Sequence, residues 1–149
     1  MTAIYVDADA CPVKDEVVRV ADRHGVAVHM VSNAWMRLSE SPLVERVVVP
    51  EGPDVADDWI AERIGDTDIA ITTDIPLAAR CLAAGAQVLT PAGKAFSEDG
   101  IGNALAMRDL MGQLRDAGEI RGGAAAFSKR DRTRFLDAME ATVRAALKG

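Results

Sequence analysis

Short apolar runs alternate along this chain with stretches in which apolar residues recur at helical spacing. The apolar runs lie at residues 3–7, 26–31, 46–49, 69–74 and 86–89. Helical spacing, with Pro or Asp near the starts and Gly at several ends, predicts helices over about 12–24, 54–64, 76–82, 103–117 and 130–147. Up to residue 89 the predicted order is β-α-β-β-α-β-α-β. This order favours an α/β fold in which helices cover both faces of a mostly parallel five-stranded sheet.

Composition agrees with a single domain spanning residues 1–149. Apolar residues make up 49% of the chain and aromatic residues only 4%, so we expect an aliphatic core. No run approaches the roughly 18 consecutive apolar residues of a membrane span, and no basic leader precedes the first strand, so we expect a soluble cytoplasmic protein. Two Cys and two His, without zinc spacing, favour neither a disulfide framework nor a classical zinc site.

Two of the predicted strands end on aspartate. Asp7 and Asp9 follow the first strand, and Asp74 closes the strand at the middle of the chain. Sites in parallel α/β sheets gather at the carboxyl ends of the strands, so we expect these carboxylates to converge. Extended residues two apart point the same way, which favours joint use of Asp7 and Asp9. Clustered carboxylates are commonly neutralised by a hard cation, and the pattern predicts a site for Mg²⁺ or Mn²⁺.

A fourth ligand is expected from the helix that starts near residue 54. Asp54, Asp57 and Asp58 all lie in its first turn, where the helix dipole favours acids whatever their function. Asp57 is our choice, with Asp54, Asp58 and the later Asp99 as alternatives. Asp54 also fits a helix N-cap completed by Asp57, and Asp74 an N-cap for the helix that follows it. Asp66 and Asp68, at the opposite end of their strand, are expected in a solvent-facing turn.

The charge of the chain is split between its two parts. Residues 1–100 carry 17 Asp and Glu against 8 Lys and Arg, whereas residues 101–149 carry 6 against 9. An acidic site beside a basic segment suits an enzyme that acts on a polyanion, and the alternative is a solvated C-terminal helix of mixed charge. Candidate substrate-binding residues are Thr73, Arg108, Arg115, Lys129 and Arg130. Trp35 fits base stacking, but burial in the core or in an interface is the favoured expectation.

The chain resembles the YaiI/YqxD family of uncharacterised bacterial proteins over nearly its whole length. The resemblance is carried by residues 5–14, 54–57, 72–78, 108–111, 114–115, 122–123 and 127–128. That family is similar to PIN domains, which are Mg²⁺- or Mn²⁺-dependent ribonucleases. The resemblance implies a PIN-like three-layer α/β/α sandwich with C-terminal helices. It also implies that Asp7, Asp74 and the helical Asp57 match the acidic cluster of those enzymes.

These observations favour a metal-dependent nuclease that hydrolyses RNA through Asp7, Asp9, Asp57 and Asp74, which would act as metal ligands and catalytic residues. An alternative is a haloacid-dehalogenase-like phosphatase with Asp7 as nucleophile and Asp9 as acid and base. Its last acidic motif should follow an apolar strand directly, and residues 94–98, before Asp99, are not expected to form one. A third hypothesis is a non-catalytic module that binds RNA or another partner.

Overall fold

The structure is a computed structural model that describes residues 2–38, 40–52, 54–97, 100–101 and 128–148. Its elements are, in chain order, β1 (Ala3–Asp7), η1 (Ala8–Ala10), α1 (Lys14–His24), β2 (Ala27–Ser32), β3 (Val44–Val48), α2 (Val55–Arg63), β4 (Ile69–Ile71), α3 (Ile75–Ala83), β5 (Gln87–Leu89), β6 (Ala95–Phe96) and α5 (Lys129–Lys148). The helix expected over 103–117, with Arg108 and Arg115, lies outside the described residues, as does Asp99.

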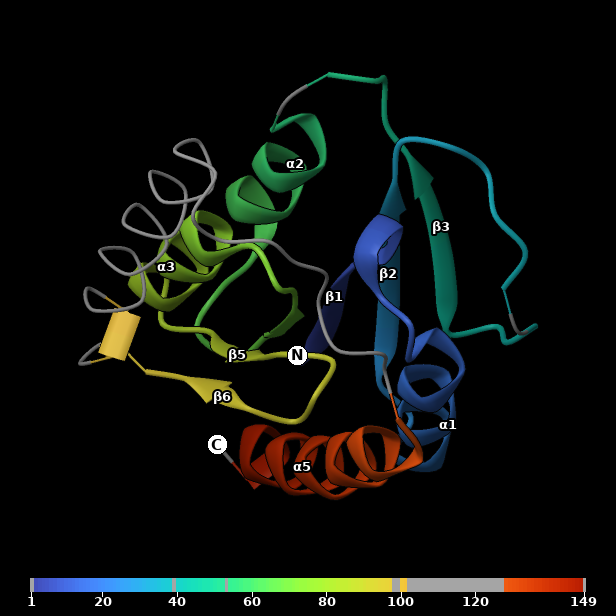
Figure 1. Cartoon of the computed structure of the whole chain (residues 1–149), viewed down its shortest axis with the longest axis vertical. Helices are drawn as coiled ribbons and strands as arrows, with labels where there is room; N and C mark the ends of the chain where they lie inside the picture. Colours follow the sequence, from blue (N-terminus) through green and yellow to red (C-terminus); the bar gives the residue numbers. More distant parts are fainter. Residues whose placement is uncertain (1, 39, 53, 98–99, 102–127, 149) are drawn as a thin grey trace, which may run out of the picture.

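The strands form one sheet in the order β3-β2-β1-β4-β5-β6 (Figure 1). β1 to β5 are parallel, which confirms the predicted mostly parallel sheet. β6 adds a sixth strand, antiparallel to β5, in a segment predicted to be a loop. A two-residue strand is too short to show the alternation by which a strand is predicted.

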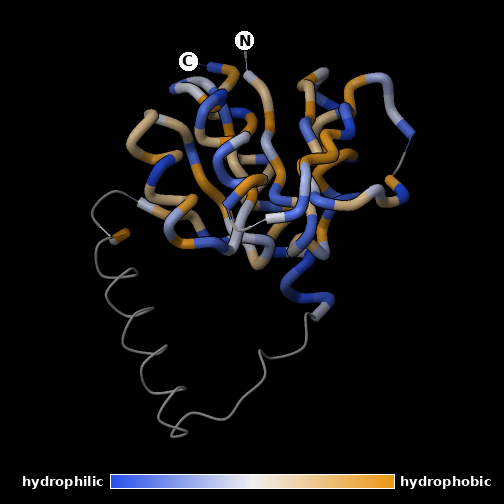
Figure 2. Tube along the Cα trace, turned by 90° about the horizontal axis from the view of Figure 1, so that it is seen from above, coloured by the Kyte–Doolittle hydropathy of each residue, from blue (hydrophilic) through white to orange (hydrophobic). Residues whose placement is uncertain are grey.

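Helices cover both faces of the sheet and complete a three-layer α/β/α sandwich, as expected (Figure 1). α1 and α5 pack on one face against Ile4 and Val6 of β1, and α2 and α3 pack on the other against Tyr5. The two sets alternate along β1 because successive side chains of a strand point to opposite faces. Figure 2 shows the hydrophobic parts of the trace gathered in the body of the molecule.

In the last helix Phe135, Met139 and Val143 recur at the helical spacing of four residues, which predicts one apolar face, and the structure confirms it. Phe135, Met139 and Val143 are fully buried in the core beneath α1 and α5. The helix begins at a capping box, in which the Ser128 hydroxyl accepts from the Asp131 amide at 3.2 Å and the Asp131 carboxylate accepts from the Ser128 amide at 3.0 Å. Within the described part of the chain, no helix is long and apolar enough to cross a membrane.

α5 runs parallel to α1, and this fixes where its basic start lies. Near the two helix starts, Arg132 donates to the Pro12 carbonyl at 3.0 Å and pairs with Glu16 at 3.2 Å. Near the end of α1, His24 contacts Glu140 at 2.6 Å. Since α1 begins just after the carboxyl end of β1, the start of α5 lies at the same edge of the sheet. Figure 2 shows this polar first turn projecting from the body of the molecule.

The turn between β5 and β6 packs closely against the backbone of α5 at Gly93. Gly93 has a φ of +87°, and a Cβ placed there would lie 2.8 Å from the carbonyl carbon and oxygen of Arg134. Gly25, which ends α1, has a similar φ of +67° but nothing within 4 Å of such a Cβ. The two glycines therefore share the backbone requirement and differ in packing.

Gly93→Ala is expected to destabilise the protein more than Gly25→Ala. The left-handed backbone alone costs about 1 kcal/mol for alanine. At Gly93 the backbone of α5 must also shift, which adds about 1–3 kcal/mol. Urea unfolding of the two variants measures the difference. Equal losses of unfolding free energy would show that the contact with α5 is not tight.

Candidate functional site

Asp7 is positioned by the register between β1 and β4. It is the last residue of β1 and lies on the α2/α3 face, one residue beyond Val6, which pairs with Ile71 of β4. The buried Thr72 therefore comes alongside, and its hydroxyl donates to the Asp7 carboxylate at 3.0 Å. The same Thr72 oxygen accepts the amide of Asp74 at 3.0 Å. One threonine thus links the two aspartates that end neighbouring strands.

Asp74 also serves as the N-cap of α3. Its Oδ1 accepts the Leu77 amide at 2.8 Å, and Pro76 stands in the first turn of that helix. The capping role expected for this residue is therefore present. It fixes the orientation of the carboxylate at the carboxyl edge of the sheet.

Asp57 approaches the same edge from the first turn of α2. Its pKa is raised from 3.8 to about 6, first by burial and then by the charges of Asp74 and Asp7. The pKa of Asp7 is also raised, first by burial, with Asp74 and Asp9 adding to the rise and the Thr72 hydrogen bond opposing it. Asp7, Asp57 and Asp74, which we call the acidic cluster, are thus mutual electrostatic neighbours.

The described cation that lowers the pKa of Asp57 is paired with another carboxylate. Arg80 of α3 lowers the pKa of Asp57, but its guanidinium is bound to Asp58 at 2.6 Å. Asp58 is therefore the ion-pair partner of Arg80. Asp54 takes the N-cap position of α2 with a φ of +65° and makes no side-chain capping bond, so the capping box predicted for Asp54 and Asp57 is wrong. Asp57 is consequently available to the cluster.

Asp9 lies beside the cluster but is held differently. The chain leaves the extended conformation at Ala8, where η1 begins, so Asp9 does not continue the alternation assumed for Asp7 and Asp9. Its Oδ2 accepts the Asn33 amide at 2.9 Å, which ties the segment after β2 to the site. Asp9 is exposed, and its charge contributes to the raised pKa of Asp7.

In each of these carboxylates one oxygen accepts no hydrogen bond from a described residue. Asp7, Asp9 and Asp74 each accept one hydrogen bond, and their second oxygens make none within the described part of the chain. Even so, no three His, Cys, Asp or Glu side chains among the described residues form a group that could hold a metal ion. The charges of these carboxylates affect one another's pKa values, but the described side chains are not grouped closely enough to hold a metal ion. A shared cation would require them, above all Asp57, to draw together.

Of the remaining predicted site residues, some are exposed and some lie outside the described residues. Thr73 is exposed, and Thr72 is the threonine that contacts an acid. Lys129 and Arg130 are exposed in the first turn of α5, and neither forms an ion pair with a described residue. Arg108, Arg115 and Asp99 fall outside the described residues. The thiols of Cys11 and Cys81 are not poised as nucleophiles, because burial raises their pKa values to about 11 and about 12.

Three residues behave differently from the prediction or were overlooked. Asp68, expected to face solvent, is buried and accepts the amides of Ala3 and Gly65, both at 2.9 Å. It is a structural anchor at the amino edge of the sheet. Trp35, for which burial was favoured, is 69% exposed. One feature of the sequence could have identified Thr72 as a partner of Asp7. Thr72 directly follows the apolar residues 69–71, as Asp7 directly follows the apolar residues 3–6.

With this geometry the chain has the acidic carboxyl edge of a three-layer α/β/α domain. The model of the family described as "Uncharacterized BCR, YaiI/YqxD family" matches residues 5–145, and the chain belongs to this family. A UPF0178 protein of Parvibaculum lavamentivorans is 65% identical over 145 residues, covering 97% of this chain and 95% of that relative. One from Ruegeria pomeroyi is 59% identical over 148 residues, covering 98% and 96%. No solved structure gives a significant match.

The crowding of the acidic cluster predicts that Asp57→Asn stabilises the metal-free protein at neutral pH. A carboxyl whose pKa is raised on folding binds its proton more tightly in the folded state. Its contribution to stability is complete below the unfolded pKa and is lost as pH rises from about 4 to about 6. Removing the charge should add about 1–2 kcal/mol to the unfolding free energy at pH 7, after allowance for solvent screening.

Urea unfolding in EDTA at pH 4 and at pH 7 tests this expectation. The gain from Asp57→Asn should be present at pH 7 and nearly absent at pH 4. Asp58→Asn is the matched control from the same helix turn, because it removes a charge already paired with Arg80 and should give no gain. A gain that is equal at both pH values would argue against charge repulsion as its cause.

Proposed function

We propose that this protein is a divalent-metal-dependent phosphodiesterase that cleaves RNA at the acidic cluster. The observation that carries the proposal is the convergence of Asp7, Asp57 and Asp74 from three separate elements, where burial first and the charges of Asp74 and Asp7 next raise the pKa of Asp57 to about 6. Such repulsion lowers stability and is commonly retained where it serves chemistry. The donor set consists of carboxylate oxygens, the ligands that Mg²⁺ and Mn²⁺ prefer.

In this proposal the uncommitted oxygens of Asp7 and Asp74 bind the cation, with Asp57 and Asp9 completing the carboxylate set. The cation would lower the pKa of a bound water and stabilise charge on the phosphate. Thr72 keeps Asp7 in place, and the N-cap bond to Leu77 keeps Asp74 in place. Asp57 loses its proton near pH 6, so at neutral pH it is ready to act as a ligand or to accept a proton from water.

The basic first turn of α5 supports a polyanionic substrate. Lys129 and Arg130 lie at the same edge of the sheet as the cluster, because Arg132 next to them is bound to the Pro12 carbonyl after β1. Positive charge at a helix start opposes the helix dipole, so the placement is unfavourable for the helix itself. Contact with the phosphates of RNA would give these two side chains a use.

Asp7→Asn and Asp74→Asn are expected to abolish Mn²⁺-dependent cleavage of a single-stranded RNA, with a loss of at least about 100-fold. Each change removes charge from the cluster while keeping the shape of the side chain. The measurement is the initial rate on an end-labelled oligoribonucleotide with purified protein. Asp66→Asn is the control, because Asp66 is exposed in the turn before β4, at the amino edge.

Three outcomes separate the hypotheses. Cleavage that survives both cluster variants, or that persists in EDTA, contradicts the proposal. Binding of RNA that ignores EDTA and yields no product identifies a non-catalytic module. Trapping of beryllofluoride on Asp7 would instead identify a phosphatase that forms an aspartyl-phosphate.

A further inference from the structure

The segment between β2 and β3 carries an exposed indole close to the acidic site. Trp35 is 69% exposed, the highest fraction among the large apolar side chains of the described residues. It stands two residues after Asn33, whose amide is bound to Asp9 at 2.9 Å. Two residues of extended chain span at most about 7 Å, so Trp35 is tethered near the acidic edge.

Arg46 of β3 stacks on this indole. Its guanidinium carbon lies 5.5 Å from the centroid of the Trp35 ring, within the range of a cation–π contact. Arg46 forms no ion pair with any described residue, so its positive charge is not cancelled by a carboxylate contact. The pair therefore combines a flat aromatic surface with a guanidinium.

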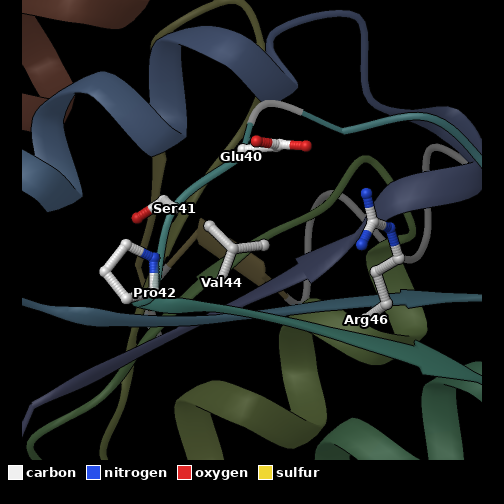
Figure 3. A pocket seen from close by; sticks show the side chains of 5 residues that line it. All are labelled: Glu40, Ser41, Pro42, Val44 and Arg46. Carbon is white, nitrogen blue, oxygen red and sulfur yellow. The ribbon is translucent and has the colours of Figure 1, made fainter.

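A pocket of about 400 Å³ adjoins the pair, lined by Glu40, Ser41, Pro42, Val44 and Arg46. Figure 3 shows Arg46 and Glu40 reaching toward the same space, with Val44 beside it, next to Pro42. The volume falls in the range of small-molecule sites. Its lining combines an apolar surface with a cation and a carboxylate, which suits the mixed chemistry of a nucleoside, whereas the Ser41 hydroxyl is already bonded to Asp22 and to the Leu43 amide.

We propose that Trp35, Arg46 and this pocket form a subsite for one unpaired nucleotide of the RNA strand. The inference rests on the proposed function, since it names the kind of RNA that the acidic site receives. The base stacks on the exposed face of Trp35, and Arg46 contacts the adjoining phosphate. Bases within a duplex have no free face to offer, so the strand bound here is single-stranded.

The test is a binding measurement made in EDTA, where cleavage does not contribute. The probe is a fluorescently labelled oligouridylate of eight nucleotides, followed by anisotropy. Trp35→Ala should raise its Kd by roughly 5- to 100-fold, whereas Trp35→Phe, which keeps an aromatic face, should change it only a few-fold. Leu147→Ala is the matched control, because Leu147 is another exposed apolar residue, near the end of α5. It should leave Kd unchanged.

A second readout reports stacking directly. The chain contains two Trp, so a Trp59→Phe protein keeps Trp35 as its one indole. Oligouridylate should quench its fluorescence to saturation, and a duplex RNA of equal length should not. Absence of binding, binding without quenching, or equal losses in Trp35→Ala and Leu147→Ala would each overturn the subsite.

The outcome of this binding experiment can be distinguished from the outcome of the cleavage assay that tests the proposed function. Stacking without Mn²⁺-dependent turnover would uphold the subsite and remove the nuclease. Turnover whose KM for RNA ignores Trp35→Ala would uphold the nuclease and remove the subsite.

Discussion

The parallel pairing of β1 with β4 is the constraint on which the rest of the site depends. It sets Val6 opposite Ile71. The residues that follow these two, Asp7 and Thr72, therefore lie side by side at the same edge of the sheet. The Thr72 hydroxyl then joins Asp7 to the amide of Asp74. A slip of one residue would turn Asp7 to the opposite face, toward the core beneath α1 and α5. The core therefore favours this register, because Ile4 and Val6 pack beneath α1 and α5 while Tyr5 packs on the opposite face.

The electrostatics of the site follow from this geometry. Three carboxylates are held near one another by a strand end, a helix cap and the first turn of a helix. The neighbouring guanidinium, that of Arg80, is committed to Asp58. The folded protein accordingly bears a repulsion that burial strengthens, which is expressed in the raised pKa values of Asp7 and Asp57. A cation that binds only the folded state would relieve this repulsion and stabilise the fold at the same time.

The sequence predicted most of the fold because the relevant signals are local. Apolar runs, helical spacing and terminal glycines located the first five strands and the helices of the described residues, and helical spacing placed Phe135, Met139 and Val143 on one apolar face. It also indicated that Asp7 and Asp74 share an edge. What escaped prediction depends on partners distant in sequence. Burial of Asp68 needs the amide of Ala3, the availability of Asp57 needs Arg80 to be held by Asp58, and exposure of Trp35 depends on how the segment after β2 is tied to Asp9.

The central claim is that Asp7, Asp57 and Asp74 share one divalent cation, and Mn²⁺ binding followed by electron paramagnetic resonance tests it most directly. Saturable binding is expected at pH 7, and it should weaken at pH 5 as the Asp57 carboxylate takes up its proton. Asp7→Asn and Asp74→Asn should each weaken binding at least tenfold, whereas Asp58→Asn should leave it unchanged. Binding that is indifferent to Asp7→Asn and Asp74→Asn would contradict the account.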